Sequence, residues 1–576
     1  MSADYSTLID ALLAAPPGRL FITSCNDDDI ETVTFGDFIR LAKWQAAEFH
    51  ERGLGSGDRV ILILPQGVCL MAAFAGAMML GAVPAILAYP NFKVNPEKFA
   101  AGLTGVTKNL QARLVVIDDE FPSGLLDHIT MADDARLARM SASHSYAEVS
   151  LPKLSFDPHG LAFIQHSAGT TGLQKGVALS HVAVLTQLRH LAVALKITDE
   201  DRIYNWLPLY HDMGLIACFM LPLVYHLPIV MQSPMEWVVR PGMMLQLISQ
   251  FRCSMAWLPN FAFQLLARRV RAEDRGDYDL SSLRALINCS EPVRAQSMDE
   301  FVCAYQSCKL PRDVVKTSYA MAENVFAITQ SPIDGAPGRL WVSGPDLWND
   351  DRVVPVTDQT GKSICFVSSG RCIDDNKVRV MAADGAALSE DSVGEITIQS
   401  DSLFGGYFNR PDVTAQVFQN GWYWSGDLGF IHDGELYVIG RKKDLIIVAG
   451  KNIYPQDIEE IVCSHPAIHD GRAVAFGIYN PDLGTEDILV VAEVEREELL
   501  DDSVEIERVL RNNIAAEIDI TARGIYLKPP RWVIKSTAGK PARSTTREKL
   551  LAEHPELRRD ETQGERPNER TGQGAY

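Results

Sequence analysis

The stretch from residue 30 to residue 330 alternates short apolar runs with longer segments of helical periodicity. The apolar runs include RVILILP, AVPAILA, ARLVVID, LAFIQHS, LPIVMQS, CSMAWLP and LRALINCS. Strands that alternate with helices form parallel sheets, because each crossover helix returns the chain to the same end of the sheet and covers one face. The pattern therefore predicts the α/β fold class, with two helix-covered, mostly parallel sheets.

The sequence pattern changes twice further along the chain. Over about residues 335–440, short strand patterns such as KVRVMAADG and GEITIQS are separated by turn residues, which predicts a β-rich subdomain. From Arg441 onward, DLIIVAG, DILVVAEVE and the charged helix DSVEIERVLRNNIAAEI predict a small α+β domain. We expect an N-terminal domain over residues 1–440, a C-terminal domain over 441–555, and a disordered polar tail over 556–576.

Composition narrows the class of protein. At 576 residues the chain exceeds what one core usually supports, and its 47% hydrophobic residues are typical of a soluble globular protein. The net charge of −20 argues against nucleic-acid binding, which needs a positive field, but it leaves small anionic ligands open. The ten cysteines lack metal-ligand spacing, and residues 1–20 lack a secretory signal, so we expect a reduced, cytoplasmic location.

One segment, Val68 to Tyr89, is nearly uncharged and about long enough to cross a membrane. It is rich in alanine and glycine, contains Pro84, and follows the strand pattern RVILILP. A buried helix followed by a buried strand explains these features better than a membrane span. We therefore expect no transmembrane segment.

HSAGTTGLQKG, residues 166–176, combines glycines, hydroxyl groups and a lysine. Glycines let backbone N–H groups approach an anion, Thr170 and Thr171 offer further donors, and Lys175 adds charge. The segment is not a Walker A loop, which needs Gly directly before Lys and Ser or Thr directly after it. Taken alone, it fits a phosphate-binding loop and an ordinary turn equally well.

Six further motifs follow in order: PLYHDMGL (208–215), NCSEPV (288–293), SYAMAEN (318–324), SGDLG (425–429), GRKKDLIIVAGKNIYPQDIEE (440–460) and STAGKPARS (536–544). Together with HSAGTTGLQKG, this ordered set resembles the adenylate-forming superfamily of acyl- and aryl-CoA synthetases, luciferases and peptide-synthetase adenylation domains. The resemblance covers nearly the whole chain. It implies an enzyme that activates a carboxylic acid with ATP.

The chemistry of that reaction explains the residues that the resemblance assigns. A carboxylate is a poor acyl donor, so its attack on the α-phosphate of ATP forms an acyl-adenylate and expels pyrophosphate, and the protein neutralises the developing charge. Thr170, Thr171, Gly172 and Lys175 would hold the phosphates, with Thr170 also catalytic. Glu323 would bind Mg²⁺, which prefers hard oxygen ligands. ATP and Mg²⁺ are the expected cofactors.

The resemblance also assigns residues to adenosine. Tyr319 would stack on adenine, and Ala320 stands where the family has glycine, which tightens the local turn. Asp427 would take both ribose hydroxyls, and Arg441 would contact the ribose or a phosphate. The full set expected around the adenine ring is Cys289, Ser290, Glu291, Tyr319, Ala320, Met321 and Ala322.

Two further assignments concern catalysis and motion. His211 would face the acyl channel and the α-phosphate, while Lys540 would place a compact charge between the carboxylate oxygen and the α-phosphate. The C-terminal domain is expected to be mobile and to pivot near Lys443, so that one active site serves two half-reactions. Gly450 would then line the tunnel for the thiol.

Each assignment has a plainer structural alternative. Glu323 could cap a helix, Tyr319 could be a core residue, and Asp427, between two glycines, could form a turn. His211 could pair structurally with the aspartate that follows it, and Lys540 could be one lysine of a basic tail.

The segment between Glu323 and SSGRC (368–372) is longer than in ordinary acyl-CoA ligases. Its surplus, GRLWVSGPDLWNDDRVVPVTDQTGKSICF (338–366), resembles the insertion of fatty acyl-AMP ligases, which is thought to hinder the rotation needed for coenzyme A use. His166 and Gln174 depart from the phosphate loop of that branch.

The leading hypothesis is a fatty acyl-AMP ligase that activates a fatty or related lipophilic carboxylic acid and loads it onto the phosphopantetheine thiol of an acyl carrier protein. A fatty acyl-CoA synthetase that uses coenzyme A is the close alternative. An inactive interaction scaffold is the alternative of another class, and the presence of both threonines, Glu323, Asp427 and Lys540 argues against it.

Overall fold

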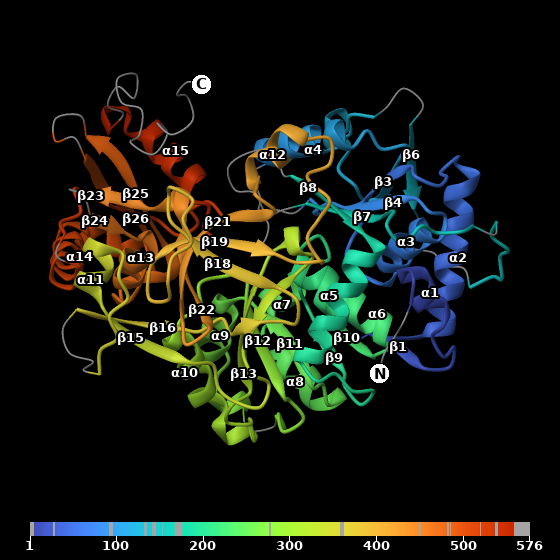
Figure 1. The fold of residues 1–576 in the computed structure, drawn as a ribbon, viewed down its shortest axis with the longest axis horizontal. Coiled ribbons are helices and arrows are strands. Elements are labelled where there is room, and N and C mark those ends of the chain that lie inside the picture. Colours follow the sequence, from blue (N-terminus) through green and yellow to red (C-terminus); the bar gives the residue numbers. More distant parts are fainter. Residues whose placement is uncertain are drawn as a thin grey trace.

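The computed structural model describes residues 5–26, 29–90, 96–131, 135–140, 146–152, 154–166, 175–275, 278–357, 362–448, 451–480, 483, 485–518, 520–535 and 540–557. Figure 1 shows the first elements of the chain, in blue, on one side of the molecule and the last elements, in red, on the other.

A nine-stranded sheet forms the centre of the molecule. Six of its strands pair in parallel in the order β13-β12-β11-β9-β10-β1, and antiparallel strands extend both edges. In spatial order the strands are β17 (Arg371–Cys372), β14 (Ala327–Gln330), β13 (Val315–Ala320), β12 (Ala285–Cys289), β11 (Met255–Leu258), β9 (Ile203–Asn205), β10 (Ile229–Gln232), β1 (Leu20–Asn26) and β2 (Asp29–Thr34).

Helices between these strands pack against the sheet. Their apolar residues belong to one large hydrophobic cluster, and each large side chain that is fully buried stabilises the fold by about 1.5–3 kcal/mol. The helices and turns are α1 (Leu8–Leu13), α5 (His181–Ala194), η2 (Met213–Met220), α6 (Leu221–Tyr225), α7 (Pro234–Val239), α8 (Gly242–Phe251), α9 (Asn260–Arg269), η3 (Ala272–Arg275), α10 (Ala295–Tyr305) and η4 (Gln306–Cys308).

The second sheet has four parallel strands in the order β4-β3-β5-β6. Its strands and helices are α2 (Phe35–Glu51), β3 (Arg59–Ile63), α3 (Val68–Met79), β4 (Val83–Ile86), α4 (Pro96–Leu110), β5 (Leu114–Asp118), η1 (Ser123–His128) and β6 (Arg136–Met140). Helices α2 and α3 approach so closely that a Cβ at Gly76 would lie 2.5 Å from the carbonyl oxygen of Ala42, so only glycine fits there.

The apolar segment from residue 68 to residue 89 is the buried helix α3 followed by the buried strand β4, as its composition predicts. Among the described residues, no helix has the length and apolar character needed to cross a membrane.

One strand pattern pairs differently from the expectation. LAFIQHS forms β7 (Leu161–His166), which pairs antiparallel with β8 (Gly176–Ser180) in a separate two-stranded sheet. The physical reason is the short connection, because a parallel return requires a crossover of a dozen or more residues. This hairpin brings the two ends of the predicted phosphate loop together.

The predicted β-rich region contains a five-stranded antiparallel sheet and a separate strand pair, β15 with β16. The short turn η5 (Ala322–Asn324) precedes this region. The elements of the region are β15 (Arg339–Ser343), α11 (Gly344–Asp350), β16 (Ser363–Val367), β18 (Lys377–Met381), β19 (Gly394–Gln399), α12 (Pro411–Val417), β20 (Phe418–Gln419), β21 (Trp422–His432) and β22 (Glu435–Arg441).

The C-terminal part packs helices on a three-stranded sheet, β25-β26-β27. Its elements are η6 (Lys442–Asp444), β23 (Ile446–Val448), β24 (Lys451–Ile453), α13 (Pro455–Cys463), β25 (Ile468–Asn480), β26 (Thr485–Val494), η7 (Glu497–Asp502), α14 (Ser503–Ile518), β27 (Gly524–Lys528), α15 (Arg543–Glu553) and η8 (Pro555–Leu557). The α/β fold class, with its parallel sheets and a smaller α+β part, is confirmed.

Candidate active site

The candidate site lies at the carboxyl ends of the central parallel strands, which is where open α/β sheets bind ligands. Strand β12 ends at Cys289, and Ser290 follows with a left-handed φ of 70° that turns the chain at this edge. Strand β13 carries Tyr319 near its end and leads into the short turn η5 that contains Glu323. The two strands therefore bring the NCSEPV and SYAMAEN motifs side by side.

Lys540 reaches this edge from the C-terminal part. Its Nζ donates a hydrogen bond to the backbone carbonyl oxygen of Ser290, 250 positions earlier in the sequence. The charge of Lys540 also acts on the buried Asp212. The structure thus brings Lys540 into the candidate site. Lys540 is therefore not simply a solvent-exposed lysine of a basic tail.

His211 and Asp212 form a close pair beside Lys540. His211 Nδ1 lies 2.6 Å from Asp212 Oδ1, and both side chains are largely buried. Burial favours the neutral form of Asp212, but His211, the Met213 N–H and Lys540 together hold its pKa below its usual value. A Cβ at Gly214 would meet the carbonyl oxygen of Pro208 at 2.3 Å, so glycine is required where this loop folds back.

Tyr319, Asp427 and Arg441 form a second group. The Tyr319 hydroxyl donates to Asp427 Oδ2 at 2.7 Å, and Arg441 Nε lies 3.5 Å from Asp427 Oδ1. Strands β21 and β22 create this arrangement, because Asp427 and Arg441 are direct partners in their register. Burial raises the pKa of Asp427, although Arg441 and Tyr319 partly offset the effect. A ligand that supplied hydrogen-bond donors would stabilise the ionised form of such a carboxylate.

Glu323 is a half-buried residue that lies next to an unusual turn. Val325 has φ 61° and ψ −54°, and the Phe326 N–H bonds to the Asn324 carbonyl at 2.6 Å, which is a γ-turn. The Tyr407 hydroxyl donates to Glu323 Oε1 at 2.8 Å. Burial raises the pKa of Glu323, so a nearby cation would stabilise its ionised form.

A magnesium ion fits Glu323 only together with other oxygens. Glu323 supplies one hard carboxylate ligand, and among the described residues no cluster of three or more His, Cys, Asp or Glu side chains could hold a metal. The remaining ligands would therefore be phosphate oxygens and water, which is the usual coordination of magnesium at nucleotides.

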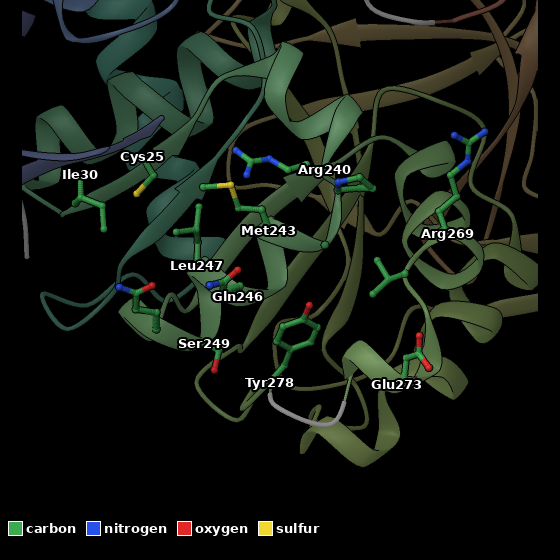
Figure 2. Close-up of a pocket in the computed structure, with 14 residues that line it drawn as sticks. Cys25, Ile30, Arg240, Met243, Gln246, Leu247, Ser249, Arg269, Glu273 and Tyr278 are labelled. Carbon is green, nitrogen blue, oxygen red and sulfur yellow. The ribbon is translucent and has the colours of Figure 1, made fainter. Parts of the chain in front are cut away.

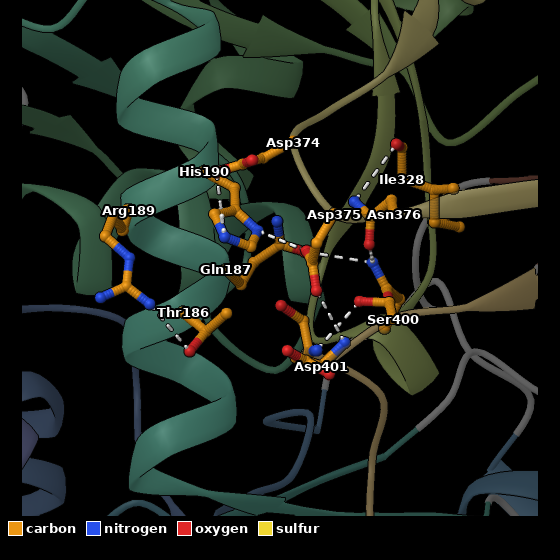
Figure 3. Close-up of polar contacts among 12 residues, drawn as sticks. Thr186, Gln187, Arg189, His190, Ile328, Asp374, Asp375, Asn376, Ser400 and Asp401 are labelled. Atoms are coloured by element: carbon orange, nitrogen blue, oxygen red, sulfur yellow. Dashed lines mark hydrogen bonds and ion pairs between the residues drawn. The ribbon is translucent and has the colours of Figure 1, made fainter.

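A polar network supports the residue that follows Glu323. Asn324 Nδ2 donates to Gln187 on α5 at 3.3 Å and to the Ala327 carbonyl at 3.0 Å. One turn later on α5, His190 lies 3.0 Å from Asp375 and 3.3 Å from Asp374 (Figure 3). The network joins helix α5 to the connection between β17 and β18 and so fixes one side of the Glu323 turn.

The other expected residues have different positions. Glu291 accepts the Phe261 N–H at 3.0 Å, and burial raises the pKa of the Cys289 thiol to about 12, so this cysteine is unreactive. Ala320, Met321 and Ala322 link β13 to the Glu323 turn. Lys443 lies in the short turn η6 and is exposed. Thr170, Thr171, Gly172, Gln174 and Gly450 lie outside the described residues.

Two residues of this region, Tyr407 and Arg543, were not predicted from the sequence. Tyr407 contacts Glu323 but follows only a pair of glycines, so no polar motif marks it. Arg543 lies three residues after Lys540, within the motif STAGKPARS. It bonds Glu459 through two nitrogens at 2.6 and 2.8 Å and Asp444 at 3.1 Å, which ties the segment after Lys540 to the segment around Lys443.

A cavity of about 860 Å³ lies elsewhere, along helix α8 (Figure 2). Arg240, Met243, Gln246, Arg269 and Tyr278 are among its lining residues. None of the residues that line it belongs to the candidate site, and we assign it no part in the chemistry.

Curated relatives match the chain over most of its length. A medium-chain-fatty-acid–[acyl-carrier-protein] ligase, JamA, from Moorena producens (strain JHB) is 28% identical and aligns with 95% of each chain. A long-chain-fatty-acid–AMP ligase, FadD26, from Mycobacterium bovis is 28% identical over 91% of this chain and 92% of the relative. A 4-hydroxyphenylalkanoate adenylyltransferase from Mycobacterium marinum is 29% identical over 91% and 86%.

Solved structures of fatty acyl-adenylate ligases resemble the structure of this chain. A structure from a study of fatty acyl-adenylate ligases from E. coli and L. pneumophila superposes with a TM-score of 0.88 at 28% identity, covering 96% of this chain and 99% of that one. The L. pneumophila fatty acyl-adenylate ligase in complex with acyl adenylate and pyrophosphate gives a TM-score of 0.72 at 28% identity, covering 95% and 96%.

The AMP-binding enzyme family matches residues 10–408, which is more than half of the chain and includes the segments that carry Lys175, His211, Ser290, Tyr319 and Glu323. The chain belongs to the AMP-binding enzyme family.

Proposed function

We propose that this protein is a fatty acyl-AMP ligase. It activates a fatty or related lipophilic carboxylic acid with ATP, releases pyrophosphate, and transfers the acyl group to the phosphopantetheine thiol of an acyl carrier protein. The observation that carries the proposal is the position of Lys540, which lies against Ser290 and near Asp212 at the carboxyl edge of the parallel sheet. The family match and the fatty acyl-adenylate ligase structures support the same chemistry.

In the first half-reaction the substrate carboxylate attacks the α-phosphorus of ATP. A new bond joins the carboxylate oxygen to phosphorus, the bond to the β-phosphate oxygen breaks, and pyrophosphate leaves with the electron pair. Lys540 neutralises negative charge between the reacting carboxylate and the α-phosphate, and its place beside the carboxyl end of β12 suits this role. His211, held by Asp212, lies on the same side of the site.

The remaining residues bind and orient the nucleotide. Tyr319 offers its ring to adenine, and its hydroxyl holds Asp427, whose carboxylate oxygens accept hydrogen bonds from the ribose hydroxyls. Lys175, which follows Thr170 and Thr171, contributes charge at the phosphates. Glu323 would hold Mg²⁺, which when bound neutralises charge on the phosphate oxygens.

The insertion supports a carrier protein, rather than coenzyme A, as the acceptor. Its helix α11 packs against β24, and Leu347 and Trp348 share a buried cluster with Ile453 and Ile458 of the C-terminal part. In Figure 1 this yellow segment lies beside the red C-terminal elements. Burial of apolar side chains stabilises a contact of this kind.

Polar contacts strengthen the same interface. Asn452 donates to both carboxylate oxygens of Asp351, at 2.9 and 3.0 Å. Outside the insertion, Arg268 pairs with Asp470 at 2.6 Å and also joins the large domain to the C-terminal part. A large rotation of the C-terminal domain about Lys443 would have to break these contacts, which opposes the use of coenzyme A.

A cytoplasmic location is part of the proposal. All ten cysteines are free thiols in the structure, which is consistent with a reducing compartment.

One assay tests the proposal and separates its alternatives. The purified enzyme is given ATP, Mg²⁺, a panel of fatty acids, and either coenzyme A or a phosphopantetheinylated carrier protein. We expect fatty-acid-dependent pyrophosphate release, accumulation of acyl-AMP with coenzyme A, and acyl transfer to the carrier. Abundant acyl-CoA would replace the proposal with an acyl-CoA synthetase, and no pyrophosphate release with any acid would favour the inactive scaffold.

A further inference from the structure

Tyr407 contacts two residues assigned to the phosphate side of the site. Its hydroxyl donates to Glu323 Oε1 at 2.8 Å, and Lys175 Nζ lies 4.6 Å from the centroid of its ring. Tyr407 is buried, with a relative exposure of 5%. One side chain therefore joins a carboxylate assigned to the metal and a lysine assigned to the phosphates, which lie 148 positions apart in the sequence.

The backbone around Tyr407 is fixed by the same two segments. In the stretch 404–408, the Phe404 N–H donates to the Glu323 carbonyl at 2.8 Å, and the Phe408 N–H donates to the Gly176 carbonyl at 2.7 Å. The stretch thus spans the gap between the turn that carries Glu323 and the strand that follows Lys175. Its position leaves the Tyr407 ring little freedom.

We propose that Tyr407 is a positioning residue for the metal and phosphate site. Its hydroxyl holds the Glu323 carboxylate in one orientation, and its ring face supports the Lys175 ammonium. A hydrogen bond to a charged acceptor and a cation–π contact both favour a single arrangement of flexible side chains. This inference rests on the proposed function, since it concerns the residues that would bind Mg²⁺–ATP.

The direct test is a metal-binding measurement on Tyr407→Phe, which keeps the ring and removes the hydroxyl. Mn²⁺ serves as the probe, and its binding to the full chain is followed by electron paramagnetic resonance in the presence of α,β-methylene-ATP. We expect the Mn²⁺ dissociation constant to rise about tenfold, because a hydrogen bond to a charged group is lost. The KM for Mg²⁺ in adenylate formation should rise by a similar factor, with little change in kcat at saturating metal.

Tyr305→Phe is the matched control. Tyr305 is fully buried in the same domain, and its hydroxyl donates to the Leu266 carbonyl at 2.7 Å, away from the candidate site. The two variants should lose similar thermal stability, whereas only Tyr407→Phe should bind Mn²⁺ more weakly. Unchanged Mn²⁺ affinity in a folded Tyr407→Phe, or equal weakening in Tyr305→Phe, would overturn the inference.

A double-mutant cycle with Glu323→Gln separates positioning from general structural support. If Tyr407 acts through Glu323, adding Tyr407→Phe to Glu323→Gln should cause little further loss of metal affinity. The same tenfold loss in both backgrounds would contradict that role.

The two proposals fail in different ways. A wild-type enzyme that binds Mn²⁺ with the ATP analogue but forms no adenylate contradicts the proposed function alone. Normal adenylate formation by the wild type, together with an Mn²⁺ affinity that is unchanged in Tyr407→Phe, contradicts the positioning role alone.

Discussion

At the scale of single residues, the candidate site depends on partly buried charges whose partners come from distant segments. Asp427 and Glu323 are both carboxylates for which burial raises the pKa, and each accepts a hydrogen bond from a tyrosine hydroxyl. Buried ionisable groups of this kind destabilise the free protein. A bound ligand offsets this cost when it supplies compensating charge or hydrogen-bond donors. The arrangement is therefore more typical of a binding site than of a structural core.

Two buried histidines near the predicted phosphate loop should make stability depend on pH. Burial lowers the pKa of both His166 and His181 to about 4. The unfolded chain takes up these protons near pH 6.5, so stability is lost as the pH falls from about 6.5 to about 4. For His181→Gln, the slope of unfolding free energy against pH should fall by about 1.4 kcal/mol per pH unit in this window, measured by urea unfolding.

The exposed His159 provides the control for this prediction. His159→Gln should leave the slope unchanged, because the His159 side chain is solvent-exposed and its replacement alters no buried group. The Leu8 N–H points at His181 Nδ1 at 3.4 Å, which requires a neutral acceptor there. Equal slopes for the wild type and His181→Gln would show that this histidine is not held neutral in the folded protein.

The sequence predicted the residues that belong to recognisable motifs better than the residues that hold them in position. Lys540 and Ser290 each belong to a motif that the sequence marks, and the structure brings these two residues into contact. Tyr407 could not be predicted from the sequence, since its importance comes from a contact with Glu323 that only the folded chain creates. Thr170 and Thr171 remain predictions, because they lie outside the described residues.

At the scale of elements, strands were more predictable than their pairing. The apolar runs at β3, β5, β11 and β12 form parallel strands as expected, because their burial on both faces gives nearly continuous apolar sequence. The order of strands in the central sheet is set by packing between segments distant in sequence, which no local pattern encodes. For β7, the length of its connection to β8 decided the antiparallel pairing.

The insertion provides a prediction at this scale. Replacing Trp348 and Asn452 together by alanine removes a buried ring and both hydrogen bonds to Asp351, and so weakens the contact between α11 and the C-terminal part. We expect acyl-CoA formation from dodecanoate to rise at least about tenfold, since the lost contacts are worth several kcal/mol. The measurement is acyl-CoA by mass spectrometry.

Trp422→Ala is the control, because the Trp422 ring contacts Arg379 within the five-stranded sheet. Both variants should keep adenylate formation within about threefold of the wild type. Intact adenylation with no gain in acyl-CoA would show that the insertion does not determine the choice of acceptor.

At the scale of the whole molecule, the enzyme is assembled from two parts that meet at the carboxyl edge of the central sheet. The large domain supplies Ser290, Tyr319 and Glu323, and the C-terminal part supplies Lys540. Arg543 bonds Glu459 and thereby holds the Lys540 segment against helix α13. In this pose Lys540 lies where the adenylation step is proposed to occur.

The two half-reactions of Lys540→Ala provide the most direct test of this account. The first is formation of dodecanoyl-AMP from dodecanoate and ATP, and the second is transfer from synthetic dodecanoyl-AMP to a phosphopantetheinylated carrier protein. In its proposed role, Lys540 neutralises charge only where the acid attacks the α-phosphate. Adenylation should therefore fall about a hundredfold or more, while transfer stays within about threefold of the wild type. Unchanged adenylation, or an equal loss of both half-reactions, would contradict the account.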